Sequence, residues 1–432
     1  MQLTVLDPGH FHAALLQKKD YADVERTVHV YAPAGADLDD YTAKIAGFNA
    51  RAEAPTHWQV QTHSGNDYFE RFLADRAGSI AVIAGNNRRK TEYLSRATAA
   101  GFNVLADKPM VIDMAGFARL QAAFVAAADQ GVLLFDIMTE RHEITTMLQK
   151  AFSQMPAVFG QLRTGTLADP AVTKESIHHF SKVVSGSPIK RPAWFFDVAQ
   201  QGEGLVDITT HLVDLVQWEC FPGRIINFNT DIEVISATRW PTRLTLAQFT
   251  HVTQLREFPA FLQPCVAADG TLEVYANGEI NYRINGIHAK VSVLWNFEAE
   301  PGAGDSHYSV LRGSRCNLVI RQGAAQAHQP TLTIEPVPGI EHADLQRALQ
   351  QAMPAIQEAY PGVAVVPAGA GWKVNVPAAF HVGHEAHFGQ VVDEFLGYMK
   401  AGALPDWEVP NMLAKYWTTT TALVLAHNTS KP

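Results

Sequence analysis

The sequence predicts an α/β protein with two domains. Residues 1–138 are expected to form a domain around a parallel sheet, and residues 139–432 an α+β domain with an open, mostly antiparallel sheet. Two observations predict this division. Short apolar runs alternate with helix-length amphipathic stretches in the first part, whereas Gly, Asn and Pro separate the apolar runs after residue 150. The length is sufficient for two or three domains.

Strand–helix units account for the first 138 residues. Amphipathic stretches at 90–100 and 114–130 lie between the last three of the apolar runs, which are Leu3–Leu6, Val28–Tyr31, Ile80–Ile83, Val104–Leu105 and Val132–Phe135. Short buried strands separated by helices are typical of β-α-β units with parallel strands. We therefore expect a Rossmann-type dinucleotide-binding domain, with its ligand beyond the carboxyl ends of the strands.

The second part is predicted to be rich in antiparallel strands. The runs are 225–235, 242–249, 270–275, 279–284, 289–297 and 317–321, with Ala276-Asn277-Gly278 as a turn between two of them. An extra segment at about 330–377 shows a strand, helix, strand pattern, with the helix at 343–360. Two further helices are expected around 388–396 and 413–427.

Composition excludes several classes of protein. The net charge of −9, without a concentrated Lys/Arg tract, argues against nucleic-acid and anionic-membrane partners. Cys220, Cys265 and Cys316 are odd in number and far apart, which excludes a disulfide framework. No window has the ~18 apolar residues that a membrane span needs, and no signal-like stretch opens the chain. We expect a cytoplasmic protein.

The first strand leads into the turn Asp7-Pro8-Gly9-His10-Phe11-His12, where a dinucleotide fold has Gly-x-Gly-x-x-Gly. Only the middle glycine, Gly9, is present, so a cofactor turn and an ordinary strand–turn–helix are both open. After the second strand, we interpret Gly35–Asp40 as a solvated loop rather than a direct ribose contact. Its carboxylates (Asp37, Asp39 and Asp40) would nevertheless repel an adenosine 2′-phosphate, which favours NAD over NADP.

Polar residues follow two later strands. The loop Gly85–Lys90 contains Asn86 and Asn87, which are candidates for contacting a pyrophosphate or an acidic substrate group, with a plain surface patch as the alternative. Asp107-Lys108-Pro109 follows the fifth strand. The proline restricts the backbone of the lysine, and a lysine held there could stabilise an alkoxide.

The segment Gly202–Asp214 carries the second set of chemical groups. If it is helical, Asp207 and His211 share one face and Asp214 lies one turn further on. A carboxylate one turn from an imidazole can orient it, and histidine is a natural proton acceptor near neutral pH. The alternative is a helix whose polar groups are hydrogen-bonded within a domain interface.

Together these motifs make the sequence similar to the Gfo/Idh/MocA oxidoreductases, the family of glucose–fructose oxidoreductase and inositol dehydrogenase. Asp107-Lys108-Pro109 stands for the family's Glu-Lys-Pro, and Gly202–Asp214 for its Asp/His helix, with Trp194 upstream. The resemblance covers about half of the chain. The single glycine of the turn, Lys90 where the family often has histidine, and the 330–377 segment indicate a divergent subgroup with an extended C-terminal domain.

The resemblance implies NAD as cofactor, with NADP as the alternative, and hydride transfer to or from a secondary alcohol of a sugar, cyclitol or related polyol. By position, Lys108, Asp207 and His211 match the catalytic residues. His211 would take the hydroxyl proton, Lys108 would stabilise the oxyanion, and Asp207 would orient His211. Cofactor contacts are expected from Gly9, His10, Phe11, His12, Asn86, Asn87, Asp107 and Lys108, and substrate contacts from Lys182, Trp194 and Asp214.

Two other functions stay open at this stage. One is an NAD-dependent glycoside hydrolase that acts by transient oxidation and elimination, and the other is a non-catalytic dinucleotide-binding sensor. His178, His179 and Arg191 are further candidates for the pocket wall. His381, His384 and His387 resemble a metal cluster, but we expect pocket-rim histidines and no metal. An open sheet usually needs a partner, so we expect a homo-oligomer through the C-terminal sheet.

Overall fold

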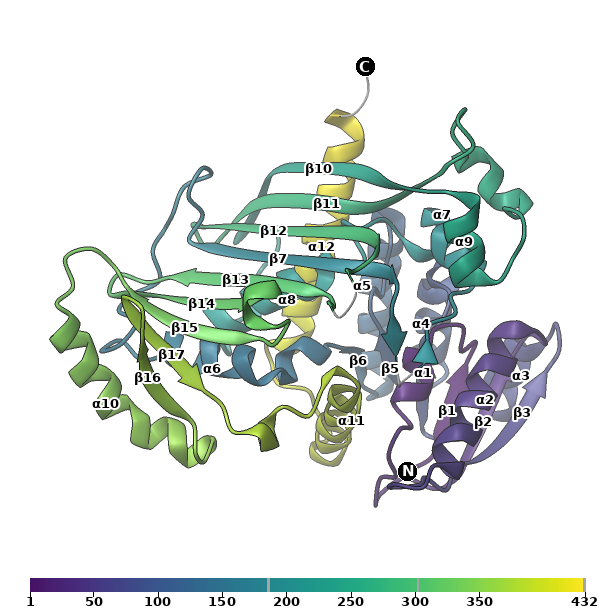
Figure 1. The fold of residues 1–432 in the computed structure, drawn as a ribbon. Helices are drawn as coiled ribbons and strands as arrows, with labels where there is room; N and C mark the ends of the chain where they lie inside the picture. The colour runs from purple at the N-terminus through teal and green to yellow at the C-terminus, as the bar shows by residue number, and fades with distance from the viewer. Residues whose placement is uncertain (185–186, 301–302, 430–432) are drawn as a thin grey trace.

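The N-terminal part of the chain folds around a six-stranded parallel sheet (Figure 1). The structure is a computed structural model that describes residues 1–432 except 185–186, 301–302 and 430–432. The strand order β3-β2-β1-β4-β5-β6 reverses direction between β1 and β4, which is the point where open α/β sheets form a ligand crevice. The strands are β1 (Leu3–Leu6), β2 (Thr27–Ala32), β3 (Gln59–Ser64), β4 (Ile80–Ile83), β5 (Asn103–Asp107) and β6 (Leu134–Ile137). This confirms the predicted Rossmann-type fold.

The helices of this part differ greatly in length. The helix after the glycine turn, α1, has only the four residues His12–Leu15. The others are α2 (Ala36–Ala50), α3 (Tyr68–Asp75), α4 (Lys90–Ala99) and α5 (Met114–Gln130). Strand β3 was not predicted, because it is an edge strand whose side chains are polar and mostly exposed and so carry no apolar signal.

A nine-stranded sheet forms most of the second part. Its order is β10-β11-β12-β7-β13-β14-β15-β17-β16, and β7 pairs with β12 in parallel while the other neighbours are antiparallel. This confirms the open, mostly antiparallel sheet. The strands are β7 (Val172–Ser181), β10 (Ile232–Leu244), β11 (Leu272–Ile284), β12 (Ile287–Glu298), β13 (Ser306–Arg312), β14 (Cys316–Gln322), β15 (Thr331–Pro336), β16 (Ala364–Ala368) and β17 (Gly371–Asn375); β8 (Val183–Val184) and β9 (Ser187–Pro188) form a separate pair.

The turn predicted at 276–278 is wrong, because these residues lie inside the continuous strand β11. Their small side chains serve packing instead. A Cβ on Gly278 would lie 2.5 Å from the side chain of Leu205, and a Cβ on Gly204 would lie 2.0 Å from the carbonyl oxygen of Ala276. The segment before α8 (Thr209–Cys220) therefore crosses the strand in close contact. The strand predicted at 242–249 is also divided, since Thr245 caps a new helix, α9 (Leu246–Thr253).

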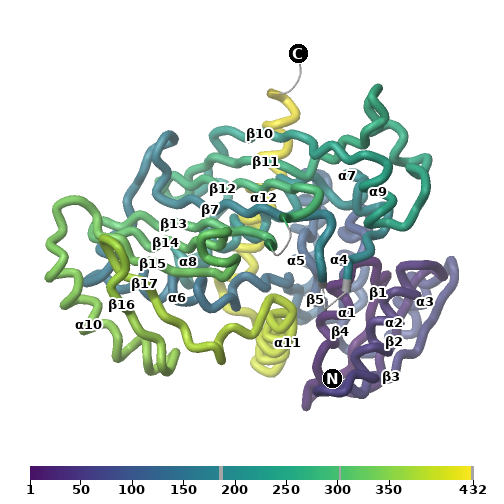
Figure 2. The backbone as a smooth tube through the Cα atoms, in the orientation of Figure 1, coloured from purple at the N-terminus to yellow at the C-terminus, as the bar shows by residue number. Residues whose placement is uncertain are grey.

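The 330–377 segment contains the predicted strand, helix and strand. Strand β15 is followed by α10 (His342–Ala359) and by the hairpin of β16 and β17, which extends one edge of the large sheet. Leu345, Leu349 and Ile356 of α10 are buried in the core of this domain. The segment therefore enlarges the second domain (Figure 2, green).

The last two helices connect the domains. Helices α6 (Ile144–Ser153), α8 and α12 (Glu408–Thr429) pack against the large sheet. Helices α11 (His384–Ala401) and α12 return to the first domain, and Phe388, Phe395 and Tyr416 belong to its core. The first domain is thus completed by the end of the chain. No helix in the described part of the chain is long and apolar enough to cross a membrane.

Candidate active site

Lys108 and Asp207 form a buried ion pair between the two domains. Lys108 directly follows β5, and Asp207 lies in the turn that leads into α8. Nζ of Lys108 is 2.6 Å from Oδ1 of Asp207, and Nε2 of Gln201 donates to Oδ2 at 3.1 Å. Burial alone would raise the pKa of Asp207, but the charge of Lys108 and these hydrogen bonds outweigh burial and lower it. The fold thus joins two of the residues predicted to be catalytic.

Lys90 supports the backbone on both sides of Lys108. Its ammonium group is fully buried and donates to the carbonyl oxygens of Asp107, at 2.9 Å, and Pro109, at 3.1 Å. Burial lowers the pKa of Lys90 to about 8, and the charge of Asp107 opposes that shift. From the sequence, the resemblance indicated only that Lys90 stands where the Gfo/Idh/MocA family often has a histidine. Its role depends on two carbonyl groups that no sequence pattern reveals.

His211 lies in the first turn of α8 and is buried. Its Nδ1 has no hydrogen-bond partner among the described residues. Burial is the main reason why the pKa of His211 falls to about 3; the charge of Lys108 lowers it further, whereas Glu140 acts in the opposite direction. The structure differs from the expectation that Asp207 orients His211, because Asp207 precedes the helix and bonds to Lys108 and Gln201.

Two histidines of the glycine turn share the carboxylate of Asp107. Nδ1 of His12 lies 2.9 Å from Oδ2 of Asp107, and Nδ1 of His10 lies 3.4 Å from the same atom. Burial lowers the pKa of both imidazoles. Their ligand atoms lie within 4.8 Å of one another, and in the described part of the chain this is the one group spaced to hold a metal ion. Phe11 packs its ring 4.6 Å from that of His10.

The asparagines of the loop after β4 contact the second domain. Nδ2 of Asn86 donates to Oε1 of Gln200, and Nδ2 of Asn87 donates to the carbonyl oxygen of Gln201, both at 2.7 Å. Gln200 and Gln201 belong to the short helix α7 (Val198–Gln201). These side chains, which were expected at a cofactor, thus hold the two domains together in this structure.

A carboxylate that the sequence did not single out organises the expected substrate side. Asp305 accepts hydrogen bonds from Lys182 at 2.8 Å and His179 at 2.9 Å, and His178 lies 3.3 Å away. Burial would raise the pKa of Asp305, but the hydrogen bonds from His178 and His179 and the charge of Lys182 hold it far below its usual range. Arg191 donates instead to backbone carbonyls of β7. Asp305 precedes β13, so only the pairing of β13 with β7 brings it near these residues.

Asp214 and Trp194 have partners of their own. Asp214 accepts two hydrogen bonds from Arg141, both at 2.7 Å, and one from Lys415 at 2.9 Å. Lys415 also contacts Asp136 of β6 at 2.7 Å. This network of charged residues is almost completely buried and joins α8 to the parallel sheet. Trp194 donates from Nε1 to Oδ2 of Asp37 at 2.9 Å.

The three histidines near residue 384 do not form a metal cluster among the described residues. His384 pairs with Glu140 at 3.2 Å, and His387 is buried with Nδ1 lacking a partner in the described part of the chain. Burial lowers the pKa of His387 to about 4. His384 and His387 belong to the first turn of α11.

The chain thus has a Rossmann-type domain joined to an open-sheet domain, with the Lys108–Asp207 ion pair between them. A family model described as "Putative oxidoreductase C terminal domain" matches residues 148–427. The chain belongs to this family of oxidoreductases, which fits its resemblance to the Gfo/Idh/MocA oxidoreductases. No curated protein matches it.

Solved structures agree with this assignment. The chain is 51% identical to a "putative oxidoreductase" from Parabacteroides merdae, with a TM-score of 0.97 over 99% of this chain and 98% of that one. It also resembles a "putative oxidoreductase" from Thermotoga maritima, at 12% identity and a TM-score of 0.62, over 100% of this chain and 99% of that one. Levoglucosan dehydrogenase in complex with NADH and levoglucosan is 13% identical, with a TM-score of 0.63 over 99% of this chain and 97% of that one. The last two likenesses show the fold alone.

Proposed function

We propose that this protein is an NAD(P)-dependent oxidoreductase that acts on a secondary alcohol, or the corresponding ketone, of a sugar, cyclitol or related polyol. The observation that carries the proposal is the buried ion pair between Lys108, which follows β5 of the parallel sheet, and Asp207, which lies four residues before His211. The charge of Lys108 also lowers the pKa of the buried His211, which supports a common site for the three residues.

The residues present fit a dinucleotide at its nicotinamide end. The strand order provides the crevice, and Lys108 and His211, whose Nδ1 has no partner among the described residues, provide polar groups for it. His10, Phe11 and Asp107 are the residues that we expect to hold the ring and its ribose. The bound nicotinamide would supply the hydride acceptor or donor.

Each side chain then has a role that its surroundings support. Burial lowers the pKa of His211 to about 3, so the imidazole is neutral at pH 7 but a weak base. We assign it the hydroxyl proton because its Nδ1 has no hydrogen-bond partner among the described residues. The Lys108 ammonium, held by Asp207, would stabilise the negative charge that develops on the substrate oxygen. Glu140 favours the protonated form of His211, so it would support the imidazolium in place of Asp207. Lys90 is a positioning residue for Lys108.

The substrate side supports a polyhydroxylated ligand. Charged and polar side chains gather on the second domain's side of the site: Lys182, His178, His179 and Asp305. Burial is the main cause of the lowered pKa of His178, and the charge of Lys108 contributes to it. Such groups can bind several hydroxyls. Asp214 is occupied by Arg141 and Lys415, so we assign it a positioning role for α8. We retain NAD as the preferred cofactor, because the acidic first turn of α2 would repel an adenosine 2′-phosphate.

Two measurements test this proposal: the mass of the purified protein with any bound dinucleotide, and the turnover of site variants. Native mass spectrometry of the purified protein should show a bound dinucleotide, or NAD should raise the melting temperature. With NAD⁺ and a panel of pyranosides and cyclitols, Lys108→Met and His211→Asn should each lower turnover by about 100-fold or more. Lys400→Met, on an exposed ion pair, is the control. Wild-type turnover in both site variants would refute the assignment, and glycoside cleavage without net NADH would favour the hydrolase.

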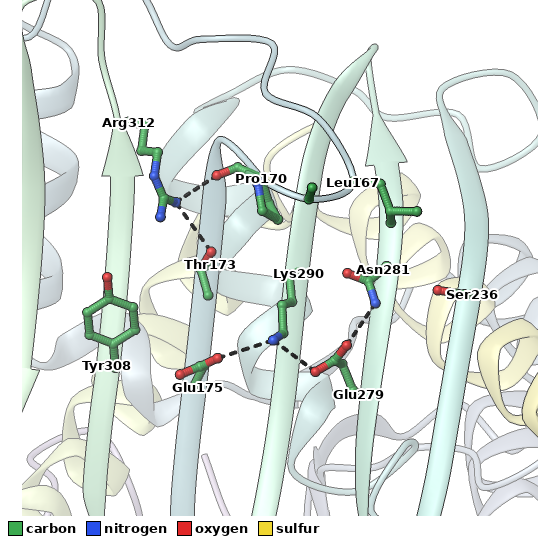
Figure 3. Close-up of a pocket in the computed structure, with 11 residues that line it drawn as sticks. Leu167, Pro170, Thr173, Glu175, Ser236, Glu279, Asn281, Lys290, Tyr308 and Arg312 are labelled. Atoms are coloured by element: carbon green, nitrogen blue, oxygen red, sulfur yellow. Dashed lines mark hydrogen bonds and ion pairs between the residues drawn. The ribbon is translucent and has the colours of Figure 1, made fainter.

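We also propose that the protein forms a homo-oligomer through the open face of the large sheet. That face carries a hollow of about 450 Å³ lined by polar side chains of several strands. Figure 3 shows Lys290 between Glu175 and Glu279. Its Nζ lies 3.5 Å from Oε1 of Glu175 and 2.9 Å from Oε2 of Glu279. Light scattering should give at least a dimer, and a monomer at micromolar concentration would exclude this arrangement. We further propose a cytoplasmic location, which the three free cysteines support.

A further inference from the structure

Two side chains cover the glycine of the dinucleotide turn. If Gly9 had a Cβ, this atom would lie 2.8 Å from Oδ2 of Asp37 and 3.1 Å from Cζ2 of Trp194. Asp37 is in the first turn of α2, and Trp194 is in the short helix Ala193–Phe196 of the second domain. In a dinucleotide fold, the middle glycine is the point where the backbone approaches the pyrophosphate. Asp37 and Trp194 therefore occupy the side of Gly9 that a pyrophosphate would use.

The two side chains are bonded to each other across the domain boundary. Nε1 of Trp194 donates to Oδ2 of Asp37 at 2.9 Å; Trp194 is buried and Asp37 is half-buried. Asn86 and Asn87 add two hydrogen bonds to the same part of the second domain. We call the Asp37–Trp194 hydrogen bond the clasp. It closes the crevice over the turn, and the asparagine contacts lie beside it on the loop after β4.

The turn itself offers few free groups to a phosphate. The N–H of Gly9 donates to the carbonyl oxygen of Asp7 at 2.9 Å, and the N–H of His10 to that of Ala84 at 3.2 Å. The helix that follows has a single turn, so its dipole is weak. Two of the three usual glycines are replaced, one of them by Asp7. These features weaken the ordinary attraction of the turn for a pyrophosphate.

The charges around the clasp are also unfavourable to an anion. Burial is the main cause of the raised pKa of Asp37, and the negative charges of Asp7 and Asp40 raise it further, against the hydrogen bond from Trp194. A pyrophosphate over Gly9 would place more negative charge beside these carboxylates. Either the carboxylate of Asp37 must move away or it must lose its charge before a dinucleotide can bind there.

We propose that the clasp competes with the dinucleotide for the space over Gly9, so that cofactor binding requires Asp37 and Trp194 to separate. This inference rests on the proposed function, because it concerns how that cofactor enters. It makes Asp37 a residue that controls cofactor affinity and couples it to the contact between the domains. The affinity for NAD⁺ should fall as the pH rises through the pKa of Asp37, because the carboxylate then becomes charged.

The experiment is a calorimetric titration of NAD⁺ into four proteins at two pH values. Asp37→Asn keeps the size of the side chain and an oxygen that can accept from Trp194, so it removes only the charge. Trp194→Phe keeps an aromatic ring but removes the hydrogen bond. Asp39→Asn is the matched control, because Asp39 is exposed on the same helix. We expect about tenfold tighter binding by Asp37→Asn, tighter binding by Trp194→Phe, and no change in Asp39→Asn.

The pH dependence adds a readout that a structural role would not give. Wild-type protein should bind NAD⁺ more weakly at the higher of the two pH values, and Asp37→Asn should show a smaller difference. Equal affinities in all four proteins would overturn the clasp and leave the proposed function standing. Weaker binding by Asp37→Asn would also overturn it, since Asp37 would then be a ligand of the ribose. If no protein binds NAD⁺, the proposed function fails together with the clasp.

Discussion

Replacing Lys415 by Met should strongly destabilise the protein. The Lys415 ammonium is fully buried and contacts Asp136 at 2.7 Å and Asp214 at 2.9 Å, and these carboxylates are also buried. Methionine preserves the length of the side chain but leaves Asp136 with only the hydroxyl of Tyr416. Removing one partner of a buried ion pair typically costs about 3–5 kcal/mol, because an uncompensated charge remains in the interior.

This loss can be converted into a melting temperature. An unfolding entropy of about 2.1 cal/mol/K per residue gives a total unfolding entropy of about 0.9 kcal/mol/K for a chain of this length. A loss of about 4 kcal/mol then lowers the melting temperature by about 4 °C. Differential scanning calorimetry measures this shift. Lys400→Met is the matched control, because Lys400 and its partner Asp23 are both more than half exposed, and an exposed pair contributes about 0–1 kcal/mol. Equal shifts in the two variants would refute the reasoning.

Three further predictions concern single positions. Lys90→Met should lower turnover at least about tenfold, because two carbonyls beside Lys108 lose their donor; unchanged turnover would show that Lys90 does not position it. Gly204→Ala should destabilise the protein by about 2 kcal/mol or more in urea denaturation, because the new Cβ would meet a backbone oxygen at 2.0 Å. Its control is Gly397→Ala, which has open space in α11 and should be neutral or stabilising in the same assay. The pKa of His387 is about 4 in the folded protein, below its unfolded value near 6.5, so the unfolded chain takes up the proton first. The free energy of unfolding therefore falls as the pH drops from 6.5 to 4. Between pH 7 and 5, His387→Gln should lose about 2 kcal/mol less of this free energy than the wild type, and an equal loss would contradict the prediction.

Much of the fold was predictable because buried strands and amphipathic helices repeat at fixed periods. The parallel sheet and the 330–377 segment followed from such runs. Strand β3 was missed because its polar side chains face solvent. The turn predicted at 276–278 failed because small residues also mark places where another segment crosses a strand, which only the contact with Gly204 shows.

The candidate site was predictable where a motif fixed local geometry. Lys108 and Asp207 were both singled out, but their pairing joins two domains and cannot be derived from spacing. The same limit applies to Asp305, which β-sheet pairing brings to His179 and Lys182. Asp37 was interpreted as part of a solvated loop, whereas the structure places it in the first turn of α2, half-buried and hydrogen-bonded to Trp194. These differences all depend on partners from distant segments.

The return of α11 and α12 to the first domain has a consequence for biosynthesis. A ribosome makes the six parallel strands early, but Phe388, Phe395 and Tyr416 of their core emerge only after the whole large sheet has been translated. Until then, the apolar surface that these helices cover stays exposed on the nascent chain. The first domain should therefore need a chaperone during synthesis, and a fragment ending near residue 138 should aggregate when it is expressed alone.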